Sequence, residues 1–272
     1  MIPAPFTYKR ASSVDEAIDL VARDGEDAKF LAGGHSLLPL MKLRLAVPET
    51  LVDIGRLSEL SYIRDEGDQI AVGAATTHGE LAASSLLGRD LPLLAHAASK
   101  VGDPQVRHCG TIGGSLAHAD PAADLPAVAL ALDATLVARG PAGSRDIPAA
   151  DFFRGLFETA LDPSELLTEI RISKPSAPGW AFQKFSKRAI DWAIVGVAVQ
   201  GGQVALVNMD QTPVRAVGVE SALAAGASPA EAAAHAAEGT SPSEDLNGTR
   251  SYREQLARVL VRRALEDAQA HA

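Results

Sequence analysis

The segment LAGGHS, residues 31–36, sets two glycines side by side directly after a short apolar run. Residues 29–32 are typical of a β-strand, and residues 37–45 predict a short helix interrupted by Pro39. Without side chains, the backbone N–H groups of such a turn can approach an anion closely, and the start of a helix adds positive potential. Ser36 adds a hydroxyl donor. The segment therefore predicts a phosphate cradle, or alternatively a tight turn that needs glycine only for its dihedral angles.

Strands and helices alternate around this turn. An extended start is followed by a helix whose Ser13 and Glu16 have capping-box spacing, and Gly25 ends that helix. Residues 51–54 predict the next strand. The order strand, helix, strand, glycine turn, helix, strand over residues 1–57 is that of an α/β unit. The glycine spacing matches neither the three-glycine dinucleotide fingerprint nor the P-loop.

A second glycine segment, GTIGGSLAHADPAADLP, occupies residues 110–126 and carries two aspartates four residues apart. An ionised carboxylate only accepts hydrogen bonds, so Asp120 and Asp124 suit ribose hydroxyls or ring N–H groups rather than phosphates. Alternatively, they cap the helix that follows, with Pro121 in its first turn. A two-aspartate metal site lacks a third ligand at a suitable spacing. Two cradles and a carboxylate together suggest one extended ligand, such as a dinucleotide.

Composition excludes several other classes of protein. The 272 residues are 47% apolar and 22% charged, as in an ordinary globular protein. The net charge is −9, and no basic run is present, which argues against nucleic-acid binding. Cys109 is the sole cysteine, so this chain alone forms no disulfide and ligates no iron–sulfur cluster. Without a signal-like or membrane-spanning apolar segment, the sequence predicts a cytoplasmic protein.

A domain boundary is predicted where two prolines and a glycine fall within residues 174–179. Three strand-like runs follow at residues 180–185, 192–200 and 203–209, and Gly201-Gly202 is a good hairpin turn. Residues 228–238 and 251–270 predict helices.

These motifs resemble, in order and spacing, the flavoproteins of the molybdenum hydroxylase family. Residues 32–44 with Val52-Asp53-Ile54 resemble the first FAD-binding segment of that family, and residues 111–115 with 119–126 resemble its second segment. Residues 185–188, 191–197, 213–216, 252–253 and 262–264 resemble the C-terminal domain. The resemblance covers nearly the whole chain and is nearest to medium subunits of the aerobic carbon monoxide dehydrogenase type.

The resemblance implies an α+β fold. Residues 1–175 would form a PCMH-type FAD-binding domain of two α+β subdomains, about 1–57 and 58–175, with FAD between them. Residues 176–272 would form a smaller α+β domain with a three-stranded antiparallel sheet and a helical bundle. Lys184, or its neighbour Gln183, would bring a polar side chain from this domain to the flavin. The implied cofactor-binding residues are Ala32, Gly33, Gly34, His35, Ser36, Thr111, Ile112, Gly113, Gly114, Ser115, Asp124 and Lys184.

The resemblance also implies an oxidoreductase that has FAD as cofactor and works as an electron-transfer subunit. Its partners would be a large molybdopterin-binding subunit and a small subunit with two 2Fe-2S clusters, assembled as a dimer of heterotrimers. Electrons would pass from the clusters through FAD to an external acceptor, and the chain alone would hydroxylate no substrate. A self-sufficient FAD-dependent oxidoreductase and a scaffold that has lost its flavin are the alternatives.

Several single residues also carry expectations. His35 could donate a hydrogen bond to a phosphate. His78 and His118 are expected on the surface or satisfied in the core, and Trp180 and Trp192 are expected to pack in the C-terminal core.

Overall fold

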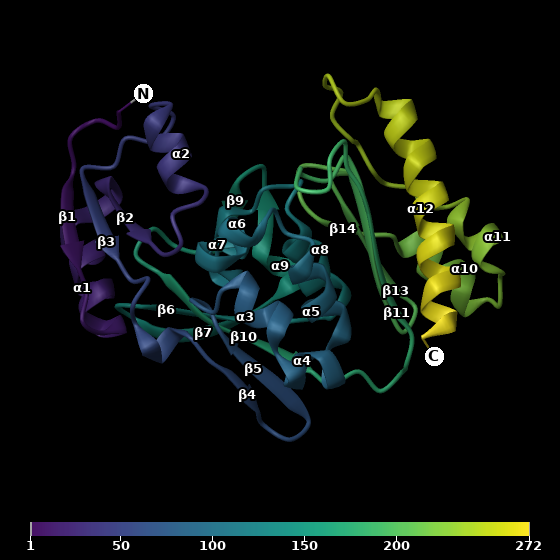
Figure 1. Cartoon of the computed structure of the whole chain (residues 1–272), viewed down its shortest axis with the longest axis horizontal. Helices are drawn as coiled ribbons and strands as arrows, with labels where there is room; N and C mark the ends of the chain where they lie inside the picture. Colours follow the sequence, from purple (N-terminus) through teal and green to yellow (C-terminus); the bar gives the residue numbers. More distant parts are fainter. Residues whose placement is uncertain (1, 272) are drawn as a thin grey trace.

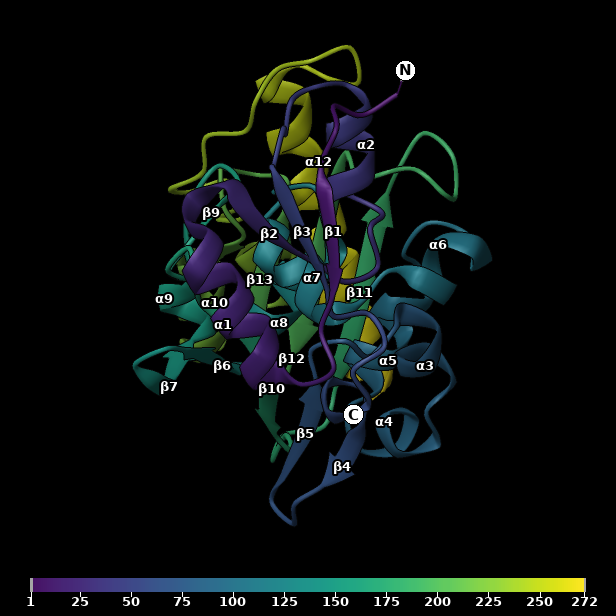
Figure 2. The ribbon, with the colours of Figure 1, turned by 90° about the vertical axis from the view of Figure 1, so that its left-hand side faces the viewer.

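A three-stranded parallel sheet, formed by the first 57 residues, lies at one side of the molecule (Figure 1). The computed structural model describes residues 2–271. The strands are β1 (Thr7–Arg10), β2 (Ala28–Leu31) and β3 (Thr50–Asp53), in the order β1-β3-β2. Helix α1 (Val14–Asp24) lies beside them in Figure 2, and α2 (Leu37–Lys42) follows the glycine turn. Strand, helix, strand, turn, helix and strand thus follow one another as predicted.

Capping explains where α1 begins. The Ser13 hydroxyl accepts the N–H of Glu16 at 3.1 Å, as the sequence predicts. The Glu16 carboxylate accepts the N–H of Ser12 at 2.7 Å rather than that of Ser13, so the reciprocal half of the capping box is shifted by one residue. The short 3-10 helices η1 (Gly25–Asp27) and η2 (Ser58–Leu60) close this part of the chain.

The middle of the chain builds a five-stranded antiparallel sheet in the order β4-β5-β10-β6-β7. Helices cover one face of it and share its core (Figure 1). The strands are β4 (Ile63–Asp65), β5 (Gln69–Gly73), β6 (Thr135–Gly140), β7 (Gly143–Pro148) and β10 (Leu166–Ser173), with a hairpin of β8 (Phe153–Gly155) and β9 (Glu158–Thr159) beside them. The helices are α3 (His78–Ala83), α4 (Ser85–Asp90), α5 (Pro92–Ser99), α6 (Pro104–Cys109), α7 (Ile112–His118), α8 (Asp124–Ala131) and α9 (Ala149–Phe152).

The last third of the chain forms an antiparallel sheet of β11 (Trp180–Phe185), β12 (Val195–Gln200), β13 (Gln203–Val207) and β14 (Val214–Arg215). Three strands are expected from the sequence, and the structure has four. The two residues of β14 are too few to show a strand pattern. Alternate residues of β12 and β13 pack toward α8 on one face and toward the C-terminal helices on the other. Those helices are α10 (Val217–Ala224), α11 (Pro229–Ala233) and α12 (Arg250–Ala270).

The helix expected over residues 228–238 is shorter in the structure. Its start is fixed by a complete capping box between Ser228 and Glu231, but regular α-helix ends at Ala233 and turns follow. Among the described residues, no helix is both long enough and apolar enough to cross a membrane.

Candidate cofactor site

A cavity of about 650 Å³ lies where the parallel sheet, the helical layer of the middle sheet and the C-terminal domain meet. Its walls come from the β2–α2 turn, α7 and the residues before it, the start of α8, β11 and the loop before β12. Its volume falls within the range of small-molecule pockets. All the expected cofactor-binding residues line it except Ile112, whose side chain is buried in the core of the middle sheet.

The first glycine turn offers free donors to this cavity. Among the described residues, none accepts a hydrogen bond from the backbone N–H groups of Gly33, Gly34, His35 or Ser36. Gly34 has a φ of +72°, which a side chain would strain. A Cβ on Gly33 would lie 2.1 Å from the carbonyl oxygen of Cys109, so this glycine lets the turn approach the segment that precedes α7. Four free N–H groups on one turn suit an anionic group such as a phosphate.

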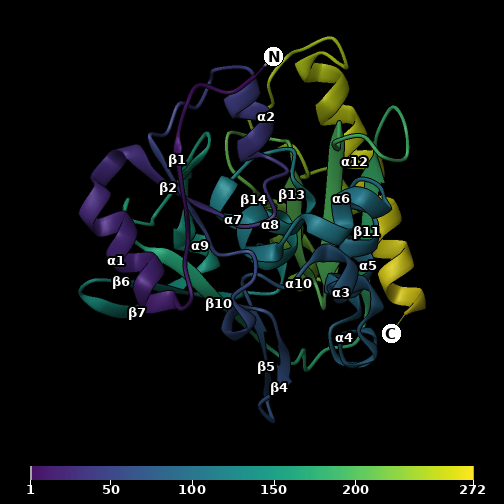
Figure 3. The ribbon, with the colours of Figure 1, turned by 60° about the vertical axis from the view of Figure 1, so that its left-hand side comes forward.

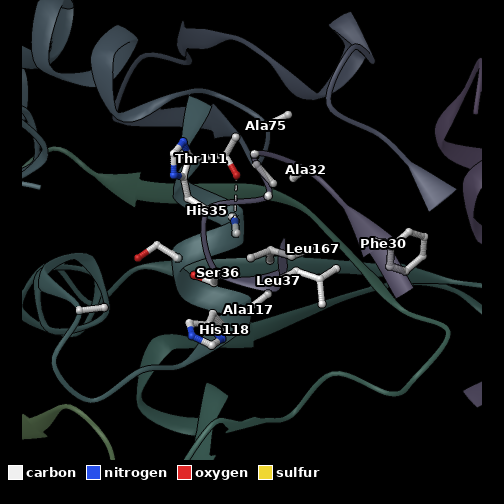
Figure 4. Close-up of a pocket in the computed structure, with 18 of the residues that line it drawn as sticks. Phe30, Ala32, His35, Ser36, Leu37, Ala75, Thr111, Ala117, His118 and Leu167 are labelled. Atoms are coloured by element: carbon white, nitrogen blue, oxygen red, sulfur yellow. Dashed lines mark hydrogen bonds between the residues drawn. The ribbon is translucent and has the colours of Figure 1, made fainter. Parts of the chain in front are cut away.

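The second glycine segment differs from the cradle that the sequence predicts. It forms the first turn of α7, with the Thr111 hydroxyl as N-cap (dashed in Figure 4). Its backbone N–H groups already have partners inside the chain: Ile112 donates to Thr76, Gly113 to Ala74, and Gly114 and Ser115 to Thr111. A Cβ on Gly113 would lie 2.5 Å from that of Ala74, so this glycine is required by helix packing. The half-buried Ser115 keeps its hydroxyl in the pocket wall.

Asp124 and Lys184 form a buried ion pair in the pocket wall. The Lys184 Nζ lies 2.7 Å from Asp124 Oδ2 and 3.2 Å from the Lys100 carbonyl oxygen. Asp124 Oδ1 has no hydrogen-bond partner among the described residues, although its residue is only 4% exposed. Burial raises the pKa of the Asp124 carboxyl to about 6, and the Lys184 charge opposes that rise. An orphaned acceptor beside an ammonium group fits a ligand with both a polar N–H or O–H group and a carbonyl oxygen.

The structure also shows where the side chains in three of the sequence alternatives lie. Gln183 points away from the pocket and donates to Asp267 at 2.5 Å, because neighbouring residues on β11 face opposite sides. Asp124 lies inside the first turn of α8 after its N-cap, Ala123, and caps nothing. Asp120 accepts the N–H of Ala122 at 2.9 Å, which makes a local turn ahead of the helix.

Two aromatic side chains, those of His78 and Trp192, differ from their expected places. His78 is neither exposed nor satisfied: it is buried, lines the pocket and has no partner for Nδ1 among the described residues. Burial, His35 and Arg107 lower the pKa of His78 to about 4, so its imidazole is neutral at neutral pH. Half-buried His118 lines the pocket beside the turn (Figure 4). Trp192 is 59% exposed at the pocket edge rather than packed in the C-terminal core, because it lies in the loop before β12.

These features fit an FAD. The cavity has the required size class, one turn presents four unpaired N–H donors, and a buried carboxylate oxygen stands unpaired within the same walls. No group of three or more His, Cys, Asp or Glu side chains among residues 2–271 is placed to hold a metal ion. The sequence missed His78 because the Thr77–Glu80 capping box indicates where α3 begins but not which side of its first turn is buried.

Comparisons with known proteins show the family to which the chain belongs. Residues 4–175 match the family model "FAD binding domain in molybdopterin dehydrogenase", and residues 180–268 match "CO dehydrogenase flavoprotein C-terminal domain". This chain is an FAD-binding medium subunit of the molybdenum hydroxylase family. It is 43% identical to the carbon monoxide dehydrogenase medium chain of Hydrogenophaga pseudoflava, and the match covers 99% of each chain.

Other relatives of this medium subunit bear different names. It is 40% identical to the alpha subunit of the 6-hydroxypseudooxynicotine dehydrogenase complex of Paenarthrobacter nicotinovorans, over 98% of this chain and 96% of the relative. A solved structure of the Hydrogenophaga pseudoflava carbon monoxide dehydrogenase superposes over the full length of both chains with a TM-score of 0.96 at 43% identity. FAD is therefore the cofactor of this medium subunit, and the protein is part of an oxidoreductase complex.

The raised pKa of Asp124 makes a prediction about pH and stability. Because the folded chain binds this proton more tightly than the unfolded chain, its stabilising contribution is complete below about pH 4 and is lost as the pH rises through about 6. We expect the free energy of unfolding of the parent, relative to Asp124→Asn, to fall between pH 4 and pH 7 in urea titrations. A parent that gains stability over the variant across this range would show that Lys184 outweighs burial.

Proposed function

We propose that this medium subunit receives electrons from the iron–sulfur clusters of a small partner subunit and passes them through FAD to an external acceptor. A large molybdopterin-binding partner would carry out the hydroxylation, with the three chains assembled as a dimer of heterotrimers in the cytoplasm. FAD supplies the redox chemistry, since a flavin accepts one electron or two. The observation that carries the proposal is a built FAD pocket in a chain whose sole cysteine, Cys109, cannot hold a cluster.

The pocket residues are proposed to bind and orient the cofactor. The free N–H groups of Gly33, Gly34, His35 and Ser36 would hold the pyrophosphate, because backbone donors at a turn suit phosphate oxygens. Asp124 Oδ1 would accept from a ring N–H or a ribityl hydroxyl, and Lys184 would donate to an oxygen of the flavin. Residues 1–57, 58–175 and 176–272 would act as three units around the pocket, with all three contributing walls.

Reconstitution of the complex tests the electron relay. We expect the three purified subunits to restore substrate-dependent reduction of a dye. Omission of this subunit should slow transfer to the physiological acceptor while leaving the first turnover at molybdenum intact. The chain alone, loaded with FAD and chemically reduced, should be reoxidised by the acceptor, yet it should turn over no organic substrate.

Two results would contradict the relay. One is oxidation of a substrate by the isolated chain at a rate comparable to that of the complex, which would indicate a self-sufficient FAD-dependent oxidoreductase instead of a relay subunit. If the complex without this chain reduced the acceptor at the full rate, electrons would be leaving by another route.

A further inference from the structure

We infer that Asn208 and Arg253 are positioning residues for the FAD pocket, and that they anchor the loop of residues 186–194 which forms one of its walls. This inference rests on the FAD site described above and adds two residues that lie outside the pocket lining. The loop joins β11 to β12 and contributes Ile190, Asp191 and Trp192 to the pocket.

The loop stands at one end of the molecule. In Figures 1, 2 and 3 it rises beyond the end of β11, at the same end as α2 and the first turns of α12. Its tip is exposed, with Ile190 54% and Trp192 59% accessible. Within the tip, Arg188 pairs with Asp191 at 3.0 Å. An exposed ion pair of this kind contributes little to holding a loop in place. The position of this loop therefore depends on the contacts at its base, Ala193 and Ile194.

Asn208 fixes that base to the FAD-binding domain. Its side-chain amide donates to the carbonyl oxygens of Ala193 at 2.8 Å and Ile194 at 3.3 Å. Its backbone N–H donates to the carbonyl oxygen of Pro121 at 2.8 Å, three residues before Asp124. Asn208 has a φ of +60°, a conformation that asparagine tolerates better than most residues. One residue therefore connects the loop to the turn that carries the Asp124 side of the pocket.

Arg253 holds the same point from the other side. Its side chain on α12 is fully buried, and Nη1 donates to the Ile194 carbonyl oxygen at 2.6 Å. Nη2 pairs with Asp245 at 2.7 Å, while Nε has no partner among the described residues. The Ile194 N–H donates to the Phe185 carbonyl oxygen at 2.8 Å and closes the loop. Burial of a guanidinium group is costly, so a buried arginine directed at one loop carbonyl indicates a specific anchoring role.

The consequence for the cofactor follows from preorganisation. When the loop base is fixed, the wall formed by Ile190 to Trp192 is already in place before the ligand binds, and binding orders less of the chain. Loss of either anchor should leave the strands intact but let the loop move, so that FAD binds more weakly.

The variant Asn208→Gly removes the side-chain contacts of Asn208 with the loop and changes little else. Glycine keeps the positive φ and the N–H bond to Pro121 but removes both side-chain bonds to the loop. We expect the Kd of the full chain for FAD, measured by quenching of flavin fluorescence, to rise roughly 10-fold, as loss of one buried hydrogen-bonded link implies. Hydrogen exchange in the FAD-free chain should accelerate over residues 186–194 and stay unchanged elsewhere.

Arg253→Met tests the second anchor independently, because it removes the hydrogen bond to the Ile194 carbonyl oxygen. Arg263→Ala is the matched control, since Arg263 is exposed on the same helix. The control should leave both the Kd and the exchange rates as in the parent. The anchoring role would be refuted if Asn208→Gly had the parental Kd for FAD and parental hydrogen-exchange rates in the loop. It would also be refuted if the exchange rates rose over the whole chain as much as in the loop. If the parent itself did not bind FAD in this pocket, the site would fail, whereas loop exchange in the FAD-free chain would still confirm or refute the anchor.

Discussion

Replacement of Gly33 by valine should reduce the FAD content of the purified chain to less than about a tenth of the parental value. A Cβ at this position would lie 2.1 Å from the Cys109 carbonyl oxygen and 2.9 Å from the Gly110 Cα, both backbone atoms that no rotamer change can move. The turn must therefore withdraw from the segment before α7. That movement displaces the four free N–H groups of residues 33–36 from the pocket.

Flavin released from the variant and quantified by chromatography measures this loss, and it should be identified as FAD in the parent. Gly88→Val is the matched control, because Gly88 is exposed on α4 and a Cβ there meets nothing within 4 Å. Valine suits a helix at least as well as glycine, so the control should retain parental flavin and stability. Full flavin occupancy in Gly33→Val would show that the turn binds no phosphate and needs glycine only for packing.

The elements that sequence reasoning found are those whose signals are local. Helix α1 begins after Ser13 and ends at Gly25 because a hydroxyl cap and a glycine act within a few residues. The hairpin between β12 and β13 turns at Gly201 and Gly202, both with positive φ. The first glycine turn leaves its backbone N–H groups without partners among the described residues, a property that depends on the turn itself, whereas phosphate binding there stays a prediction.

What the sequence could not supply depends on partners far along the chain. Residue 113 is glycine because a Cβ there would meet Ala74, a contact that no spacing within residues 110–115 indicates. Asp124 is paired with Lys184, sixty residues away on another domain. Asn208 and Arg253 likewise donate hydrogen bonds to the loop of residues 186–194, which precedes both of them in the chain. They bind its backbone carbonyl oxygens, and because every residue has one, the sequence does not indicate these contacts.

Replacement of Lys184 by methionine should lower the free energy of unfolding at pH 7 by about 1–3 kcal/mol, because the buried Asp124 carboxyl then loses its hydrogen-bond partner. In the parent, Lys184 provides the sole hydrogen bond to the Asp124 carboxylate among the described residues. Without it the Asp124 pKa should rise further, because burial is then unopposed. Urea titration measures the loss. Arg262→Met, which removes an exposed pair at 3.8 Å with Glu266, should change stability by less than about 0.5 kcal/mol.

The double variant Lys184→Met with Asp124→Leu separates packing from recognition. Apolar side chains of similar volume often replace a buried ion pair without loss of stability, so this variant should unfold at nearly the parental urea concentration. Its affinity for FAD should stay low, because the pocket has lost both the unpaired Asp124 oxygen and the ammonium beside it. These two results together would show that apolar side chains can replace the pair at the junction of α8 and β11, but that recognition of the cofactor needs the pair itself. If FAD affinity instead returned together with stability, the pair would be structural only, and recognition would lie with the turn at Gly33 and the remaining walls.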